Sequence, residues 1–265
     1  MPYRLALVTG ATSGIGKEMC RLLAGKGINL LITGRSEGEL SGLRETLSSL
    51  VSVRTYQADL ATPEGRRTLI TALQEHTPDL VINNAGFGLY GEALTYSVEE
   101  QSAILEVNGK ATLELSLEAA RSLVSQGCKG VILNVSSAAA FHFYPSMAVY
   151  AASKAFINQF SQALDYEMEP YGIRVLTICP GMVDTAFQQR AGRQQESLNK
   201  GFMQPKYIAE QMWHQIESLQ PLKIVDWKYR FLTSLATILP KRLTPSLEKR
   251  IIDSRIKLRT ILKTR

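Results

Sequence analysis

Residues 9–16 read TGATSGIG and stand between a short apolar run and a segment of helical periodicity. Glycines at positions 10, 14 and 16 let the backbone turn tightly and approach a pyrophosphate, and the following helix offers unpaired N–H groups to an anion. The spacing is G-x-x-x-G-x-G rather than the commoner G-x-G-x-x-G. We interpret this stretch as the phosphate-binding turn of a dinucleotide-binding sheet, although a turn without a ligand is the alternative.

Outward from this turn, strand-like and helix-like segments alternate along the chain. Strictly alternating order predicts a parallel sheet with helices on both faces, and continuous apolar runs such as LALV and LLIT are typical of strands buried on both sides. We therefore predict an α/β fold with a single-domain, Rossmann-type, doubly wound parallel sheet of about seven strands. The expected strands are 4–9, 28–33, 51–57, 80–83, 130–136, 173–179 and 222–225; the expected helices are 17–26, 37–48, 63–75, 98–125, 149–168 and 207–218.

The composition limits the class of protein. A length of 265 residues, with 45% hydrophobic and 20% charged residues, suits one large globular domain. The three cysteines (Cys20, Cys128 and Cys179) form no CxxC pair, so we expect no metal site and a reducing compartment such as the cytoplasm. We also expect no leader segment before the first strand and no membrane span, since no apolar run approaches about 20 residues.

The positive charge is concentrated at the C-terminal end. Residues 221–265 carry twelve Lys and Arg against three acidic residues, a net charge of +9, whereas the first 220 residues carry −3. We divide the chain into a dinucleotide-binding catalytic domain, 1–226, and a basic amphipathic helical extension, 227–265, interrupted by Pro240. The extension could contact a membrane surface, or pack on the domain or a second subunit. Nucleic-acid binding is not expected, because no aromatic-interleaved basic motif is present.

The end of the second predicted strand indicates which dinucleotide is bound. An acidic residue there usually bonds the 2′-hydroxyl of NAD, but this chain has Gly34 followed by Arg35. A guanidinium can bind a phosphate with two hydrogen bonds, so the pair predicts NADP(H); an ordinary solvated arginine is the alternative. Asp59, after the third strand, could bond the adenine amino group or simply close a turn.

Residues 150–154 read YAASK and place a phenol and an ammonium one helical turn apart. A neighbouring cation stabilises a phenolate and lowers the pKa of the tyrosine from about 10. A tyrosine of this kind can exchange a proton with a reacting carbonyl. Taken alone, the pair could equally be a surface helix with an extended lysine.

Five motifs in order carry a resemblance to a known family: TGATSGIG, NNAG (83–86), NVSS (134–137), YAASK and PGMVDT (180–185). Over about residues 3–220 the chain resembles a short-chain dehydrogenase/reductase of the compact, single-domain kind. It further resembles the loosely defined subgroup of bacterial ketone reductases of varied specificity. The resemblance implies a homodimer or homotetramer.

The resemblance also implies roles for individual residues. Tyr150 matches the catalytic acid/base, Lys154 the lysine that bonds the nicotinamide ribose, and Ser137, rather than Ser136, the catalytic serine. Asn108 matches an asparagine that holds a water for proton relay, and Thr185 the residue that bonds the carboxamide. The expected cofactor contacts are Gly10, Thr12, Ser13, Gly14, Ile15, Gly16, Arg35, Asp59, Leu60, Asn84, Ala85, Gly86, Tyr150, Lys154, Pro180, Gly181, Val183 and Thr185.

We therefore expect an NADPH-dependent oxidoreductase that reduces an apolar ketone or aldehyde to an alcohol. A 3-oxoacyl or steroid-type reductase is the alternative within the family, and a non-catalytic NADP(H)-binding regulatory or membrane-peripheral protein is the alternative outside it. Two loops should wall the substrate, with Phe141, Phe143, Tyr144 and Met147 on 138–147 and Phe187, Phe202 and Met203 on 182–203. His142 is interpreted as a solvated residue rather than a second acid.

Overall fold

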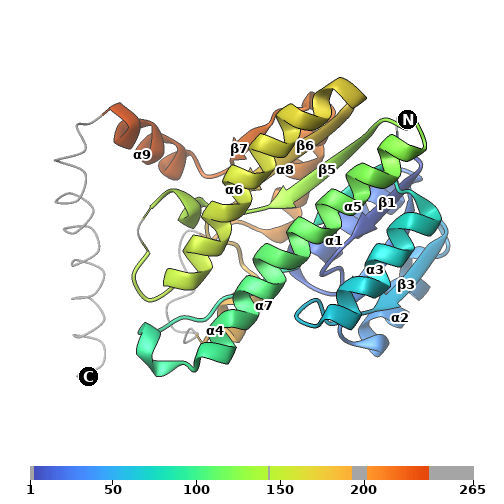
Figure 1. Ribbon diagram of the computed structural model, residues 1–265. Helices are drawn as coiled ribbons and strands as arrows, with labels where there is room; N and C mark the ends of the chain where they lie inside the picture. Colours follow the sequence, from blue (N-terminus) through green and yellow to red (C-terminus); the bar gives the residue numbers. More distant parts are fainter. Residues whose placement is uncertain (1–2, 143, 193–201, 239–265) are drawn as a thin grey trace.

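A parallel seven-stranded sheet forms the centre of the protein in the computed structural model, which describes residues 3–142, 144–192 and 202–238 (Figure 1). The strand order is β3-β2-β1-β4-β5-β6-β7. The strands β1 to β3 are thus added toward one edge of the sheet and the strands β4 to β7 toward the other, and this order reverses between β1 and β4. The fold class is thus confirmed as a doubly wound, Rossmann-type sheet. The strands are β1 (Leu5–Val8), β2 (Asn29–Gly34), β3 (Val53–Gln57), β4 (Leu80–Asn83), β5 (Gly130–Val135), β6 (Ile173–Cys179) and β7 (Leu222–Ile224).

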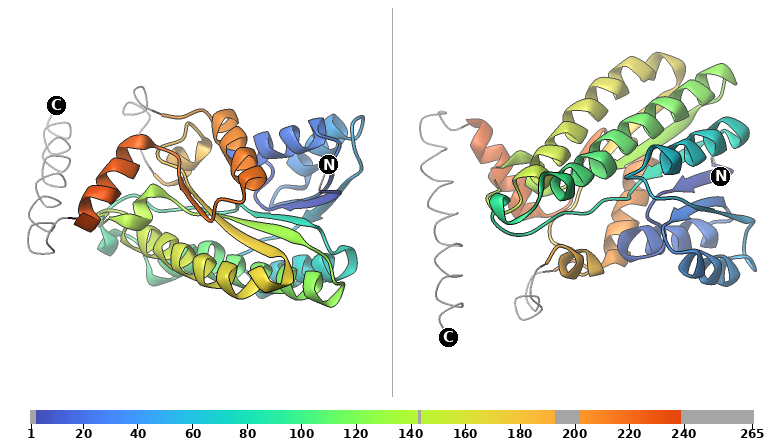
Figure 2. Two further views of the ribbon diagram at one scale, coloured as in Figure 1. Left: turned by 90° about the horizontal axis from the view of Figure 1, so that it is seen from above. Right: turned by 60° about the horizontal axis from the view of Figure 1, so that its bottom comes forward.

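Helices cover both faces of the sheet, as the alternating order predicts (Figure 2). Successive strand residues point to opposite faces, so Ala6 and Val8 pack with α1, α2 and α8, whereas Leu7 packs with α3 and α5. The long helices are α1 (Gly14–Gly25), α2 (Glu37–Leu47), α3 (Pro63–His76), α5 (Thr112–Ser125), α6 (Ala148–Met168), α8 (Pro205–Ser218) and α9 (Trp227–Ile238), and the shorter ones are α4 (Val98–Ile104) and α7 (Ala186–Arg190).

One expected helix differs from the structure in a way that bears on the site. Residues 98–125, predicted as a single α-helix, form α4, a π-helical segment η2 (Leu105–Ala111) and then α5. A capping box formed by Ser97 and Glu100 begins this stretch. A π segment widens the helix locally, and such segments occur frequently at functional sites. Here it contains Asn108, the asparagine expected near the reaction centre.

The C-terminal extension is described only in its first part. α9 occupies the first of the two predicted amphipathic stretches, and the second, around 247–262, lies outside the described residues, as does Phe143. Within the described part of the chain, no helix is both long and apolar enough to cross a membrane. Membrane contact by the extension therefore stays a prediction.

A buried arginine connects the loop after β3 to the helices on one face. The Arg66 side chain is 2% exposed, and its guanidinium forms ion pairs of 2.9 Å with both Glu106 and Glu114. The same group donates to the backbone carbonyls of Leu60 and Ala61, at 3.0 and 3.1 Å. This arrangement fixes the loop that carries Asp59, one wall of the cleft described below.

We expect Arg66→Met to lower the free energy of unfolding by about 3 kcal/mol, because two carboxylates and two buried carbonyls lose their donor. The neighbouring Arg67 provides a matched control, since its side chain is 70% exposed and only pairs with Glu64. Arg67→Met should change the same quantity by less than about 0.5 kcal/mol. Urea unfolding followed by circular dichroism measures both, and equal effects would contradict the role assigned to Arg66.

Candidate active site

A cleft of 440 Å³ lies along the carboxyl ends of the strands, where the sheet order reverses. Ligands of open α/β sheets bind at such a position. Segments that follow β1 to β6 contribute to its walls. The sequence-predicted residues that line it are Gly10, Thr12, Ser13, Gly14, Ile15, Arg35, Asp59, Leu60, Asn84, Ala85, Gly86, Ser137, Tyr150, Lys154, Pro180, Gly181, Val183 and Thr185.

Hydrogen bonds from Asn84 stabilise the conformation of the glycine-rich turn. The Asn84 amide donates to the carbonyls of Thr9 and Gly10, at 2.9 and 3.3 Å. Gly10 has a positive φ of 64°, and a Cβ at Gly16 would lie 2.3 Å from the Gly10 carbonyl oxygen. Gly16 is absent from the residues that line the cleft, and its lack of a side chain permits the turn to pack closely on the first helix; its expected contact with the cofactor stays a prediction.

The end of the cleft beside β2 and β3 carries Arg35 and Asp59. Arg35 is exposed and lines the cleft directly after Gly34, where a Cβ would lie 2.7 Å from the Thr12 methyl group. Glycine at this position is thus required by packing as well as compatible with a phosphate. The Asp59 carboxylate accepts a hydrogen bond of 3.0 Å from the Ala61 N–H, so it closes a turn while lining the cleft.

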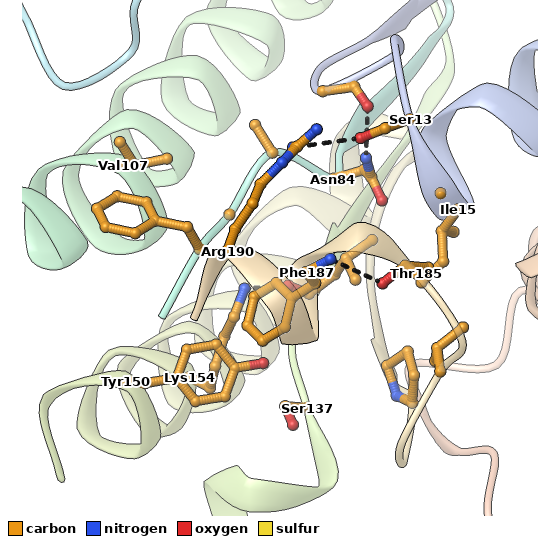
Figure 3. A pocket seen from close by; sticks show the side chains of 18 of the residues that line it. Ser13, Ile15, Asn84, Val107, Ser137, Tyr150, Lys154, Thr185, Phe187 and Arg190 are labelled. Carbon is orange, nitrogen blue, oxygen red and sulfur yellow. Dashed lines mark hydrogen bonds between the residues drawn. The ribbon is translucent and has the colours of Figure 1, made fainter. Parts of the chain in front are cut away.

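Tyr150, Ser137 and Lys154 come together at the other end of the cleft (Figure 3). The Ser137 hydroxyl interacts with the Tyr150 phenol and acts to lower the pKa of that phenol. Lys154 lies one helical turn along α6, with Nζ 5.8 Å from the centroid of the tyrosine ring and 2.8 Å from the Val135 carbonyl oxygen. Ser136 instead donates to the Lys154 backbone carbonyl at 2.9 Å, which leaves Ser137 as the serine directed at the phenol.

The pKa values at this end correct one expectation. Burial raises the pKa of Tyr150 to about 12, and the Ser137 hydrogen bond only partly offsets it, so the phenol is not acidified in this structure as YAASK alone suggests. Burial also lowers the pKa of Lys154 to about 8. The two groups share one desolvated environment, which disfavours the charged form of each.

Asn108 lies behind the cleft rather than in its wall. It is fully buried in η2, and its amide both accepts from the Phe87 N–H at 3.0 Å and donates to the Phe87 carbonyl at 2.9 Å. The same amide donates to Ser153 Oγ at 3.1 Å. A Cβ at Gly86 would lie 3.0 Å from Asn108 Oδ1 and 3.3 Å from Lys154 Nζ, which places the asparagine beside the lysine.

The short helix α7 contributes Phe187 and Arg190 to the wall of the cleft. Phe187 lies beside the Tyr150 ring, with centroids 5.5 Å apart, and Arg190 extends to Ser13 of the glycine turn, with Nη1 3.5 Å from Oγ (Figure 3). A Cβ at Gly14 would lie 2.9 Å from the Thr185 methyl group, so glycine lets this segment approach the turn. Sequence reasoning missed Arg190, because nothing in its local pattern separates it from a surface arginine.

The substrate walls follow the expected loops only in part. Tyr144, Met147 and Phe187 line the cleft, as do Tyr90 and Tyr229, which the sequence did not indicate. Met203 packs against the hydrophobic core under α1 and α8. Phe141 and Phe202 are also absent from the walls of the cleft, as far as the described residues define it. His142, expected to be solvated, contacts α9 through Tyr229 and Thr233.

Comparisons with known proteins show which proteins this chain is similar to. An oxidoreductase of Staphylococcus epidermidis, itself uncharacterized, is 33% identical over 184 residues, which cover 69% of this chain and 79% of the relative. The structure of a short-chain dehydrogenase from Sphingobium yanoikuyae in complex with NADPH matches with a TM-score of 0.80 and 28% identity, over 83% of this chain and 87% of that one. The bulky-bulky ketone specific alcohol dehydrogenase from Comamonas testosteroni matches with a TM-score of 0.77 and 25% identity, over 91% and 96%.

The family itself is identified by a match along most of the chain. The model of the short chain dehydrogenase family matches residues 4–196, which include the glycine turn, the strands β1 to β6 and the residues Ser137, Tyr150 and Lys154. The chain is therefore an oxidoreductase that belongs to the short chain dehydrogenase family.

Proposed function

We propose that this protein is an NADPH-dependent carbonyl reductase that converts an apolar ketone or aldehyde to an alcohol. The observation that carries the proposal is one continuous cleft with a glycine-rich turn at one end and Tyr150, Ser137 and Lys154 together at the other. Such a cleft suits a dinucleotide lying along the strand ends, with its reactive ring beside the phenol.

The residues of the cleft fit a dinucleotide. The tight approach of Gly16 to Gly10 leaves backbone N–H groups of the turn and of the α1 N-terminus available to a pyrophosphate. Among the described residues, three cations line the cleft, Arg35 at one end, Arg190 beside the glycine turn and Lys154 at the other end, and Asp59 is the one carboxylate there. When bound, the nicotinamide supplies the hydride that the protein itself lacks.

The preference for NADPH rests on Arg35 and its surroundings. The preceding Gly34 has no carboxylate to repel a phosphate, and the Thr12 side chain occupies the space that a side chain at 34 would need. An exposed guanidinium at the rim can bind a 2′-phosphate with two hydrogen bonds. The similar Sphingobium protein was solved with NADPH, which supports the same choice here.

The protonation states favour the reductive direction. With its pKa raised to about 12, Tyr150 remains a neutral phenol at pH 7 and holds the proton that a reduced carbonyl oxygen must receive. Ser137 can donate a second hydrogen bond to the same oxygen as negative charge develops on it. Protonated Lys154, one turn away, stabilises the phenolate that remains after transfer. Asn108, through Phe87, holds the loop beside Lys154 in place.

The substrate class rests on the aromatic walls. Tyr90, Tyr144, Met147 and Phe187 surround the reaction end of the cleft, and such walls suit an apolar group beside the carbonyl. The similar Comamonas protein is a bulky-bulky ketone specific alcohol dehydrogenase, which supports a ketone. Reduction of a 3-oxoacyl or steroid-type ketone is the alternative within this class.

A non-catalytic NADP(H) sensor is the alternative of another kind. A sensor would have no use for a desolvated phenol beside a serine and a lysine, so the arrangement of Tyr150, Ser137 and Lys154 favours an enzyme. The homodimer or homotetramer, the cytoplasmic location and the peripheral membrane contact of residues 227–265 stay predictions.

Tyr150→Phe removes the proton donor and should lower kcat by at least about 100-fold, while the Kd for NADPH stays within about twofold. NADPH absorbance loss with a panel of ketones and aldehydes, together with protein fluorescence titration, measures the two quantities. Tyr171→Phe, at a tyrosine that is 57% exposed, is the control and should behave like the wild type. Substantial turnover by Tyr150→Phe would reject the assigned acid.

Arg35→Asp should raise the Kd for NADPH roughly 10- to 100-fold and leave the Kd for NADH within about threefold. Only NADPH has a 2′-phosphate, which would lose its attraction to the guanidinium and be repelled by the new carboxylate. Arg44→Asp on the exposed side of α2 makes the same change of charge away from the cleft and should affect neither. Equal weakening of both dinucleotides by Arg35→Asp would show that Arg35 does not contact the 2′-phosphate.

The reduction should depend on the protonation of Lys154. Since burial lowers its pKa to about 8, the ammonium loses its proton as the pH rises through about 8. We expect kcat/KM to be level below that pH and to fall above it, because the phenolate formed at Tyr150 loses the neighbouring positive charge.

The variant Lys154→Met should be slow at every pH and show no fall near 8. Lys110→Met, at a lysine that is 49% exposed, should keep the wild-type profile. A fall near pH 8 that persists in Lys154→Met would mean that another group titrates.

A further inference from the structure

The C-terminal helix α9 reaches back to the substrate end of the cleft. It begins at Trp227, close after β7, and lies beside the segment that follows β5 (Figure 2). Tyr229, in its first turn, lines the same cleft as Ser137 and Tyr150. The family match ends at residue 196, so this helix belongs to the part of the chain outside the matched region.

Asp226 caps the start of α9 and lies beside Gly181, which lines the cleft. Its carboxylate accepts a hydrogen bond of 2.9 Å from the Lys228 N–H, and its carbonyl accepts one of 3.0 Å from the Arg230 N–H. A Cβ at Gly181 would lie 3.0 Å from Asp226 Oδ2, so the absence of a side chain there lets the aspartate approach. The start of α9 therefore packs closely against the segment that follows β6.

Two residues one turn apart on α9 hold the loop after Ser137. The Tyr229 ring lies 6.4 Å from the His142 ring, centroid to centroid, and Thr233 Oγ1 lies 3.4 Å from His142 Nε2. The same loop supplies Tyr144 and Met147 to the cleft. α9 thus forms one side of the cleft, where a substituent of the substrate would lie. His142 is the residue of the loop that α9 contacts.

The outward face of α9 differs from the inward one. Trp227 and Phe231, also one turn apart, are each 65% exposed, whereas Tyr229 and Thr233 face the protein. Tyr229 is therefore directed into the cleft by the helix geometry. Its ring offers an apolar face and its hydroxyl one polar contact, a combination that suits a large substituent rather than a small one.

We propose that Tyr229 is a specificity-determining residue, which contacts the substituent of the carbonyl substrate and makes α9 a wall of the substrate pocket. This inference rests on the proposed carbonyl reductase function. It assigns to the first part of the C-terminal extension a role in selecting bulky, apolar or aromatic substrates. The role is separate from proton transfer, which the Ser137 and Tyr150 pair performs.

The test compares Tyr229→Ala with wild type on a bulky aryl ketone and on a small aliphatic aldehyde. We expect kcat/KM for the bulky ketone to fall about 10-fold and that for the small aldehyde to change by less than about threefold. The Kd for NADPH should be unchanged, which also shows that the variant is folded. Phe231→Ala, two residues along the same helix on the exposed face, is the matched control and should match the wild type.

The possible results separate this inference from the function on which it rests. Unchanged activity of Tyr229→Ala on both substrates, or an equal loss on both, would overturn the specificity role while leaving the reductase function standing. A wild-type protein that reduces no carbonyl in a broad panel would overturn the proposed function, and this inference with it. Tyr229→Phe should keep the bulky preference if the ring face is the main contact.

Discussion

The hydrogen bond from Lys154 Nζ to the Val135 carbonyl oxygen joins the helix of the reaction centre to the sheet. It ties the second turn of α6 to the last residue of β5, and Ser136 adds a bond back to the Lys154 carbonyl. Because both ends of the lysine are held, Tyr150, one turn earlier, has a defined position over Ser137. The burial that strengthens these bonds also raises the pKa of Tyr150 and lowers the pKa of Lys154, so it favours the neutral form of each side chain.

A buried polar network extends this anchoring through the centre of the protein. The Asn83 amide donates to Ser116 Oγ and Asn134 Oδ1, and the Asn134 amide donates to Ser161 Oγ. The network therefore joins β4, α5, β5 and α6, four elements that are far apart in the sequence. Polar groups so deeply buried are costly unless paired, and their pairing specifies one arrangement of helices on strands. This network of Asn83, Ser116, Asn134 and Ser161 therefore holds in place the strands and helices whose ends form the cleft.

The walls of the cleft are supported in different ways at its two ends. At the dinucleotide end, Asn84 and Arg66 hold the glycine turn and the loop after β3 by hydrogen bonds to backbone carbonyls. At the substrate end, aromatic rings from separate segments pack beside Tyr150, and α9 completes the wall through His142. This division suits a family in which one ligand is constant and the other varies, since side-chain contacts change more readily than a backbone cradle.

Local patterns in the sequence determined the fold class and the order of the elements, because apolar periodicity and the glycine turn act over a few residues. They also indicated Tyr150, Lys154 and Arg35, which stand in short readable motifs, whereas Ser137 came from the resemblance to the family. Only the tertiary structure placed Gly16 and Asn108 behind the cleft, divided the helix at η2, and brought Arg190 and Tyr229 to it. It also decided the pKa of Tyr150, because desolvation depends on every segment packed around a group and no local pattern records that sum.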